Sequence, residues 1–129
     1  MSLVHDNFIV SYEVKFESKE IVFHTIYYGR NPYENTDIIF KGVASHYFQD
    51  TNKDNIIFDI EESEAKYMFD KYKKLFEYKW KWNWPFKFEK RDEFIAYVEY
   101  KKLRFFEIDS VCGLNGWVLA TDMEIVQMN

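Results

Sequence analysis

The chain has 129 residues, of which 47% are hydrophobic and 30% are charged, a balance typical of a folded domain rather than a disordered chain. Its single cysteine excludes an internal disulfide, and its short apolar runs exclude a membrane-spanning helix. The length predicts one domain over residues 1–129, with residues 1–3 set aside as the kind of sequence that an expression vector leaves.

The net charge of −5 is unevenly distributed along the chain. Residues 66–104 hold 12 basic and 6 acidic side chains, a net charge of +6, so the remainder carries −11. Two interpretations stay open: the asymmetry steers a partner to one face, or basic helices lie against acidic strand ends. The N-terminus lacks the basic start and apolar stretch of a signal peptide, and the sequence therefore predicts a cytoplasmic protein.

The first half of the chain predicts four strands. Residues 8–17 alternate between apolar and polar side chains, and residues 20–28 are β-branched and aromatic throughout. A long third strand is expected over 37–48, with a bend at Gly42, and a fourth over 55–60. Short connections between these strands predict an antiparallel meander.

Two helices are expected next. Ser63 is a suitable N-cap for a helix that runs to about Tyr78, with apolar residues at three- and four-residue spacing. Asp92 can cap a second, short helix, although a strand is the alternative there because FIAYVEY is also rich in β-formers.

The end of the chain predicts two more strands, over 103–109 and 117–126. The order β-β-β-β-α-α-β-β indicates an α+β fold: a mainly antiparallel sheet of about six strands with the helices packed on one face. Between the helices, the alternation of residues 80–86 before Pro85 predicts an extended segment.

This extended segment is also the first candidate binding site. Aromatic rings and lysines alternate in it, and both residue types occur where proteins bind single-stranded nucleic acid or a protein partner. The alternative is plain packing, in which the tryptophans enter the core and the lysines face water. The residues concerned are Trp80, Trp82, Trp84, Lys79 and Lys81.

The second candidate is an acidic edge formed by Glu61, Glu62 and Glu64, next to Asp59. Carboxylates at this spacing suit a hard metal such as Mg²⁺, and Glu64-Ala65-Lys66 matches the Glu-x-Lys of some metal-dependent nucleases. That motif requires a strand, however, and here it lies at the expected start of a helix. A solvated strand end beside a helix N-terminus is therefore favoured over a metal site.

Cys112 lies in a glycine-flanked loop, but nothing in the sequence places a histidine near it, so a buried or incidental cysteine is favoured over a nucleophile. The sequence holds no glycine-rich phosphate loop and no Cys-x-x-Cys. We therefore predict no catalytic residues, no metal and no cofactor.

Two stretches carry a resemblance to known proteins. One begins at Gly42-Val43 and includes Asn55-Ile56-Ile57-Phe58-Asp59-Ile60-Glu61-Glu62, and the other is Gly113-Leu114-Asn115-Gly116-Trp117-Val118-Leu119-Ala120. Together they resemble small, acidic, single-domain bacterial proteins of uncharacterised families, some of which are regarded as immunity proteins of toxin systems. This resemblance implies stoichiometric binding of one protein partner and no catalysis.

The sequence thus predicts a non-catalytic protein that binds another protein through the Trp/Lys segment or, for a basic toxin, through the acidic edge. Nucleic-acid binding through the Trp/Lys segment is the alternative, and a metal-dependent hydrolase built on the acidic cluster is the third hypothesis. No membrane is expected as a partner, and the oligomeric state is left undetermined.

Overall fold

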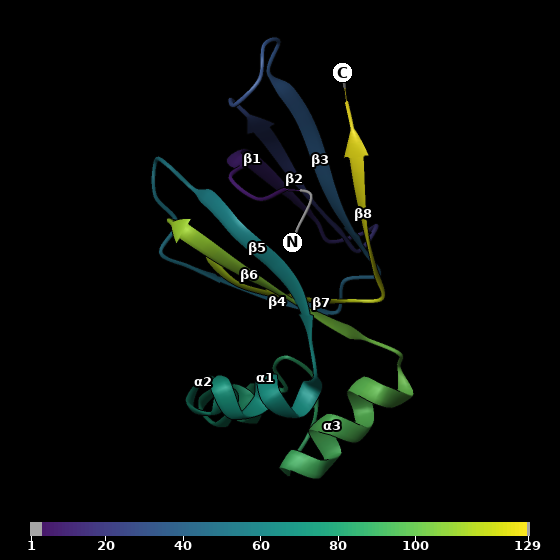
Figure 1. Ribbon diagram of the computed structural model, residues 1–129. Helices are drawn as coiled ribbons and strands as arrows, with labels where there is room; N and C mark the ends of the chain where they lie inside the picture. Colours follow the sequence, from purple (N-terminus) through teal and green to yellow (C-terminus); the bar gives the residue numbers. More distant parts are fainter. Residues whose placement is uncertain (1–3, 129) are drawn as a thin grey trace.

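A computed structural model describes residues 4–128, which contain eight strands, three α-helices and one 3-10 turn (Figure 1). Residues 1–3, which the sequence analysis set aside as vector-derived, lie outside the described residues. The elements are β1 (Phe8–Lys15), β2 (Glu20–Tyr27), β3 (Glu34–Lys41), β4 (Ser45–Gln49), β5 (Ile56–Ser63), α1 (Ala65–Lys71), α2 (Lys73–Lys79), the 3-10 turn (Trp80–Trp82), α3 (Arg91–Tyr100), β6 (Arg104–Cys112), β7 (Asn115–Ala120) and β8 (Asp122–Gln127).

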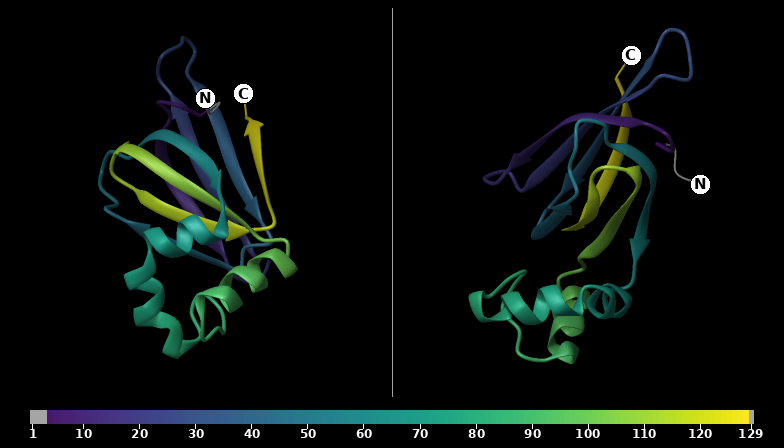
Figure 2. Two further views of the ribbon diagram at one scale, coloured as in Figure 1. Left: turned by 60° about the horizontal axis from the view of Figure 1, so that its bottom comes forward. Right: turned by 90° about the vertical axis from the view of Figure 1, so that its left-hand side faces the viewer.

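The strands form one antiparallel sheet in the order β4-β7-β6-β5-β1-β2-β3-β8. Its middle is nearly split, because β1 and β5 pair only at Phe8 and Ile56. The strands on either side of this junction form two halves that fold over one another (Figure 1, Figure 2). The α+β class and the antiparallel sheet are confirmed, but the expectation of about six strands and two helices was wrong.

Two hydrophobic cores lie on opposite faces of the β4-β7-β6-β5 half. The first fills the space between the two halves and includes Phe23, Phe40 and Phe106. The second lies between the outer face of this half and the helices, which gather on that side (Figure 2). Strand β7 serves both cores, because neighbouring residues on a strand point to opposite faces. Accordingly, Trp117 belongs to the helix-side core and Val118 to the inner one.

Two of the predicted strands are broken, and both breaks lie at one corner of the fold. The expected strand over 37–48 divides at Gly42, where φ is +63° and the predicted bend becomes a change of sheet half. The expected strand over 117–126 divides at Thr121, whose backbone N–H and Oγ1 both lie 3.0 Å from the carbonyl oxygen of Lys41. The meander therefore ends at β3: β4 pairs with β7, and β8 pairs with β3.

The helical region is also more divided than the sequence indicated. The helix expected from Ser63 to Tyr78 is two helices, because Tyr72 leaves the helical conformation with φ −108° and ψ 26°. Ser63 is the last residue of β5, and Glu64 is the N-cap. The second predicted helix is confirmed as α3, which begins one residue before Asp92. No helix in residues 4–128 is long and apolar enough to cross a membrane.

The alternating pattern of β1 is interrupted by a bulge at Val10, where the pairing with β2 skips from Ile9 to Ser11. The extra residue changes which side chains share a face, so Ile9 is buried but Val10 is exposed. Phe16, expected on the buried face, lies beyond the end of the strand and is 83% exposed. The alternation alone, which groups Val10 and Phe16 with the apolar face of the strand, therefore placed these two side chains wrongly.

Gly116 of β7 lies where the backbone of β4 comes very close, so a substitution there tests how tightly the two strands are packed. Its φ of +147° and its position leave no room for a side chain, since an added Cβ would lie 1.8 Å from the carbonyl oxygen of Tyr47. We expect Gly116→Ala to destabilise the fold by about 2–3 kcal/mol, because the neighbouring strand backbone must move. Thermal unfolding measures the loss. Gly29→Ala, which meets only the ring of Tyr27, is the matched control and should change stability by less than about 1 kcal/mol.

Candidate functional site

The Trp/Lys segment forms a compact turn at the end of α2 rather than the extended segment that was predicted. The chain continues from α2 into the 3-10 turn, and Asn83 ends it in the left-handed conformation with φ +57°. Asparagine adopts this conformation more readily than most residues, and the N–H of Asn83 donates a 2.9 Å hydrogen bond to the carbonyl oxygen of Trp80. Trp80 and Trp82 therefore lie within the turn and Trp84 lies beyond it, rather than all three on one face of an extended segment.

Trp84 points toward the core, whereas Trp80 and Trp82 do not. Its ring centroid lies 5.6 Å from that of Trp117 and 6.0 Å from that of Phe76, both fully buried. Trp84 is itself half-buried. The packing interpretation therefore holds for this tryptophan, which ties the turn to the helix-side core.

The other aromatic residues of the turn are exposed to solvent. Trp80 is 47% exposed, Trp82 is 57% exposed, and Tyr78, at the end of α2, is 62% exposed. The rings of Tyr78 and Trp82 lie 5.6 Å apart at an angle of 58°. We call Tyr78, Lys79, Trp80, Lys81 and Trp82 the Trp/Lys surface.

Two lysines are held against these rings. The ammonium of Lys81 lies 4.4 Å from the centre of the Trp82 ring, and that of Lys79 lies 5.7 Å from the same ring. Such cation–π contacts contribute about 0.5–1 kcal/mol at exposed positions. None of the ion pairs between described residues involves Lys79 or Lys81. Both positive charges therefore remain available to a partner.

The basic residues elsewhere in 66–104 are partly used within the fold. Lys71 pairs with Glu107, and Arg91 binds Asp70 with two hydrogen bonds of 2.9 and 3.0 Å. Arg104 makes a further ion pair with Glu62. The interpretation that basic residues meet acidic partners within the fold thus applies to Lys71, Arg91 and Arg104. Lys79 and Lys81 of the Trp/Lys surface have no such partner among the described residues, and the steering of a partner stays a hypothesis.

The structure does not bring the predicted acidic edge together as one site. The Glu62 carboxylate accepts a 2.7 Å hydrogen bond from Arg104, which also binds Asp122 at the start of β8. Glu61 directly precedes Glu62 in β5, and its side chain therefore points to the opposite face of the sheet. Glu64 is exposed before α1, as a helix-start residue should be. Each glutamate has separate surroundings.

A different set of carboxylates gathers on β5 and β6. Asp59 pairs across the strands with Asp109, and Glu61 pairs with Glu107. A hydrogen bond with Asp59 raises the pKa of Glu61 above its ordinary value, and the charges of the other three carboxylates act in the same direction. Lys71 offsets part of this charge through Glu107. Sequence reasoning missed Glu107 and Asp109, although their two-residue spacing repeats that of Asp59 and Glu61.

The metal and thiol hypotheses receive no support from this geometry. Within residues 4–128, no group of three or more acidic, histidine or cysteine side chains is arranged to hold a metal ion. Cys112 is exposed, which excludes the buried one of the two expected alternatives, and its sulfur lies 3.7 Å from the carbonyl oxygen of Asp54. Among the described residues, this carbonyl oxygen is the group that accepts a hydrogen bond from the thiol.

No protein-family profile, curated protein or solved structure matches this chain. The Trp/Lys surface is therefore judged by its own chemistry: exposed, ordered aromatic rings with unpaired positive charges beside them. Aromatic side chains of this kind supply much of the affinity of protein interfaces, and surrounding charges set orientation and encounter rate.

Two histidines give the fold opposite responses to pH. A 2.9 Å hydrogen bond to Asp37 raises the pKa of His24, so its charged form stabilises the fold below the ordinary pKa of histidine and is lost as pH rises through the higher, folded-state value. Burial lowers the pKa of His46, so this residue destabilises the fold as pH falls below the ordinary value.

We expect His24→Gln to lose more stability relative to the parent protein at about pH 5.5 than at about pH 9, because the charged imidazole gains more from Asp37 than the neutral one does. His46→Gln should show the reverse trend and make the fold less sensitive to acid. Urea unfolding of the three proteins at both pH values measures this. Equal losses for His24→Gln at both pH values would contradict the expectation.

Proposed function

We propose that this protein is a non-catalytic binding domain whose Trp/Lys surface docks on an acidic region of one protein partner. The observation that carries the proposal is the exposure of Tyr78, Trp80 and Trp82 beside two lysines that have no carboxylate partner among the described residues. Large apolar rings left in water have a favourable free energy to gain from a partner that covers them.

The turn presents these rings in an ordered arrangement. Trp84 packs on Trp117, and Asn83 closes the turn by a hydrogen bond to Trp80, so little additional ordering of the backbone is required when a partner binds. Trp82 and Tyr78 are also restrained by contact with one another and with Lys81. Preorganised aromatic anchors lose less conformational entropy on association.

Positive charge determines which partner fits. Glu77 is the one acidic residue in the segment 73–82, which also contains four lysines. The ammonium groups attract carboxylates, and their burial against a partner without such groups would be unfavourable. The resemblance to immunity-type proteins in the sequence supports stoichiometric binding of one protein in a bacterial cytoplasm. The acidic edge of Glu61, Glu62 and Glu64 is the weaker docking candidate, because Arg104 already forms an ion pair with Glu62.

Nucleic acid is the alternative ligand, and one feature of the Trp/Lys surface argues against it. Bases bind such surfaces by stacking flat on an open aromatic face. Lys81 occupies one face of Trp82, and the Tyr78 ring is tilted by 58° from that of Trp82 rather than parallel to it. The two rings therefore do not form a continuous stacking platform.

The test combines capture from a host lysate with substitutions on the Trp/Lys surface. We expect a protein to be recovered near stoichiometrically with the parent chain, with or without nuclease treatment. The double variant Lys79→Glu/Lys81→Glu should weaken its binding by about tenfold or more, since attraction becomes repulsion. Trp82→Ala should weaken binding similarly through loss of an aromatic anchor. Lys79, Lys81 and Trp82 lie outside the core, so either variant should lower stability by no more than about 1–2 kcal/mol, the scale of the cation–π contacts that are lost.

Matched controls separate this surface from general effects of charge and exposure. Lys66→Glu/Lys101→Glu reverses two other exposed lysines of the helical region, and Tyr100→Ala removes a ring that is 80% exposed on α3. Both controls should retain the partner. Loss of the captured material on nuclease treatment, with tryptophan fluorescence quenched by an oligonucleotide, would instead establish nucleic-acid binding.

A further inference from the structure

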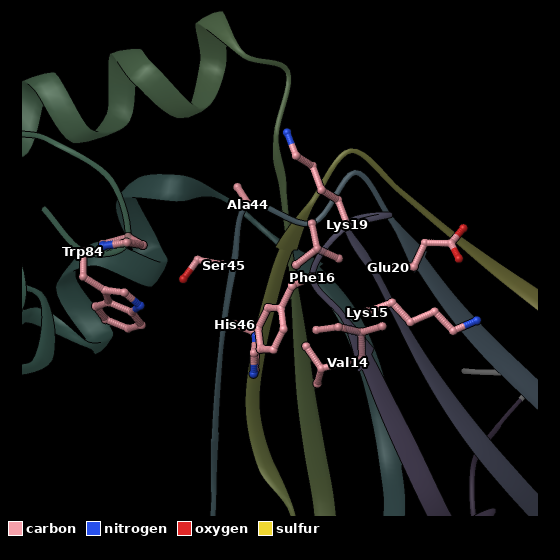
Figure 3. A pocket seen from close by; sticks show the side chains of 12 residues that line it. Val14, Lys15, Phe16, Lys19, Glu20, Ala44, Ser45, His46 and Trp84 are labelled. Atoms are coloured by element: carbon pink, nitrogen blue, oxygen red, sulfur yellow. The ribbon is translucent and has the colours of Figure 1, made fainter.

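A groove of about 390 Å³ lies where the two halves of the sheet meet beside β4 (Figure 3). One wall is the tip of the β1–β2 hairpin, residues 14–16 and 19–21, and the other is residues 43–46 at the start of β4. Trp84 and Pro85 line it from the helical side. We call the contact between the hairpin tip and residues 43–46 the seam. No strand pairing crosses it, because β4 pairs only with β7.

The seam is closed by one backbone hydrogen bond and by side-chain packing. The N–H of Val43 donates to the carbonyl oxygen of Lys19 at 2.9 Å, which among the described residues is the backbone hydrogen bond that joins the two walls. Further along β4, the ring of Phe48 lies 5.4 Å from that of Tyr12 and 5.5 Å from that of Phe23 on the facing strands. Because no ladder crosses the seam, it can open locally while the ladders within each half stay intact.

His46 lies on the inner face of β4, at the margin of the core between the two halves. It pairs across the strands with Val118, a residue of that core, and its ring lies 4.8 Å from that of Phe48 on the same face of β4. Val14 and Ile21 line the opposite wall of the groove. The imidazole is therefore half-buried among apolar groups, and among the described residues it makes neither a hydrogen bond nor an ion pair.

The charged groups that line the groove with His46 all belong to the hairpin, and none of them compensates a charge on its ring. They are Lys15, Lys19 and Glu20, whereas β4, β7 and the helical side contribute none. Lys15 lies 4.0 Å from Glu13, and Glu20 is in cross-strand register with Lys15. Burial therefore lowers the pKa of His46 below the ordinary value of histidine, and no neighbouring carboxylate opposes this shift.

We infer that protonation of His46 opens the seam, so that the hairpin tip separates from residues 43–46 in acid and stays in contact with them near neutral pH. In the closed seam a charged imidazole lies among apolar side chains without an acceptor, whereas in the open seam water solvates it. The proton therefore binds more strongly to the open form. By linkage, closure is fully favoured above the ordinary pKa of histidine and is weakened as pH falls below it.

Opening of the seam exposes apolar surface that is covered at neutral pH. Val14 and Ile21 lose the wall that faces them, and Phe48 loses its ring contacts with the hairpin strands. The fold thus contains an acid-sensitive margin on its inner core, while the helix-side core has no part in the change. This response involves neither Trp80 nor Trp82 and is independent of the proposed docking at the Trp/Lys surface.

Two neighbouring amides of the full chain provide a matched test. The N–H of Val43 bonds across the seam to Lys19, whereas the N–H of Ala44 donates a 2.8 Å hydrogen bond to the carbonyl oxygen of Leu119 within its own half. We expect the protection of Val43 to fall by about tenfold between about pH 7.5 and about pH 5, since each unit between the two pKa values of His46 is worth a factor of ten. Ala44 should keep its protection. Hydrogen exchange followed by NMR, corrected for the intrinsic effect of pH on exchange, measures both.

Substitutions of the two histidines assign the response to one ring. His46→Gln takes up no proton in this range, so Val43 should stay protected at about pH 5. His46→Leu is a second variant without a titratable group and should behave in the same way. His24→Gln removes the histidine of β2 that is bonded to Asp37, and the acid response of Val43 should persist in it.

Three results would overturn the inference. The first is unchanged protection of Val43 in the parent protein at about pH 5. The second is an equal loss of Val43 protection in the parent protein and in both His46 variants, which would assign the response to another group. The third is a parallel loss at Val43 and Ala44, because acid would then destabilise the whole fold rather than open the seam.

Discussion

The fold depends on Trp117, the largest side chain that is completely buried. Its ring centroid lies 5.3–6.4 Å from those of Phe105, Tyr47, Tyr72, Phe76 and Trp84, which come from strands, helices and the loop after the 3-10 turn. The indole N–H has no hydrogen-bond acceptor among the described residues, a cost of about 1–3 kcal/mol that extensive aromatic packing must exceed. This aromatic centre therefore joins the helical layer to the sheet, together with the ion pair between Lys71 of α1 and Glu107 of β6.

This centre also determines the geometry of the Trp/Lys surface. Trp84 joins the core through Trp117 and Phe76, and Asn83 ends the turn in the left-handed conformation directly before Trp84. The position of Trp82 in water is thus a consequence of the position of Trp84 in the core. A substitution at Trp84 would alter the surface by loosening its support, whereas one at Trp82 acts on the surface itself. A change in binding on substitution of Trp82 therefore reports on the Trp/Lys surface alone.

The limits of sequence reasoning are clearest where a local pattern competes with a longer-range contact. The spacing of Trp80, Trp82 and Trp84 favours a strand, yet Asn83 and the packing of Trp84 produce a turn. Gly42 was recognised as a bend because glycine adopts positive φ, but the equivalent break at Thr121 depends on two contacts with Lys41, 80 positions away. Of the four carboxylates that gather on β5 and β6, the sequence indicated only Asp59 and Glu61. Glu107 and Asp109 join them through the pairing of the two strands.

Charge assigns different roles to neighbouring parts of the molecule. The ion pairs of Lys71, Arg91 and Arg104 hold the helices and strands to one another, while Lys79 and Lys81 contact only aromatic rings. The fold itself does not consume the charges of Lys79 and Lys81, which is what the proposed docking of an acidic partner at the end of α2 requires. Trp84 and Pro85 connect that region to a groove whose other walls are the β1–β2 hairpin and residues 43–46.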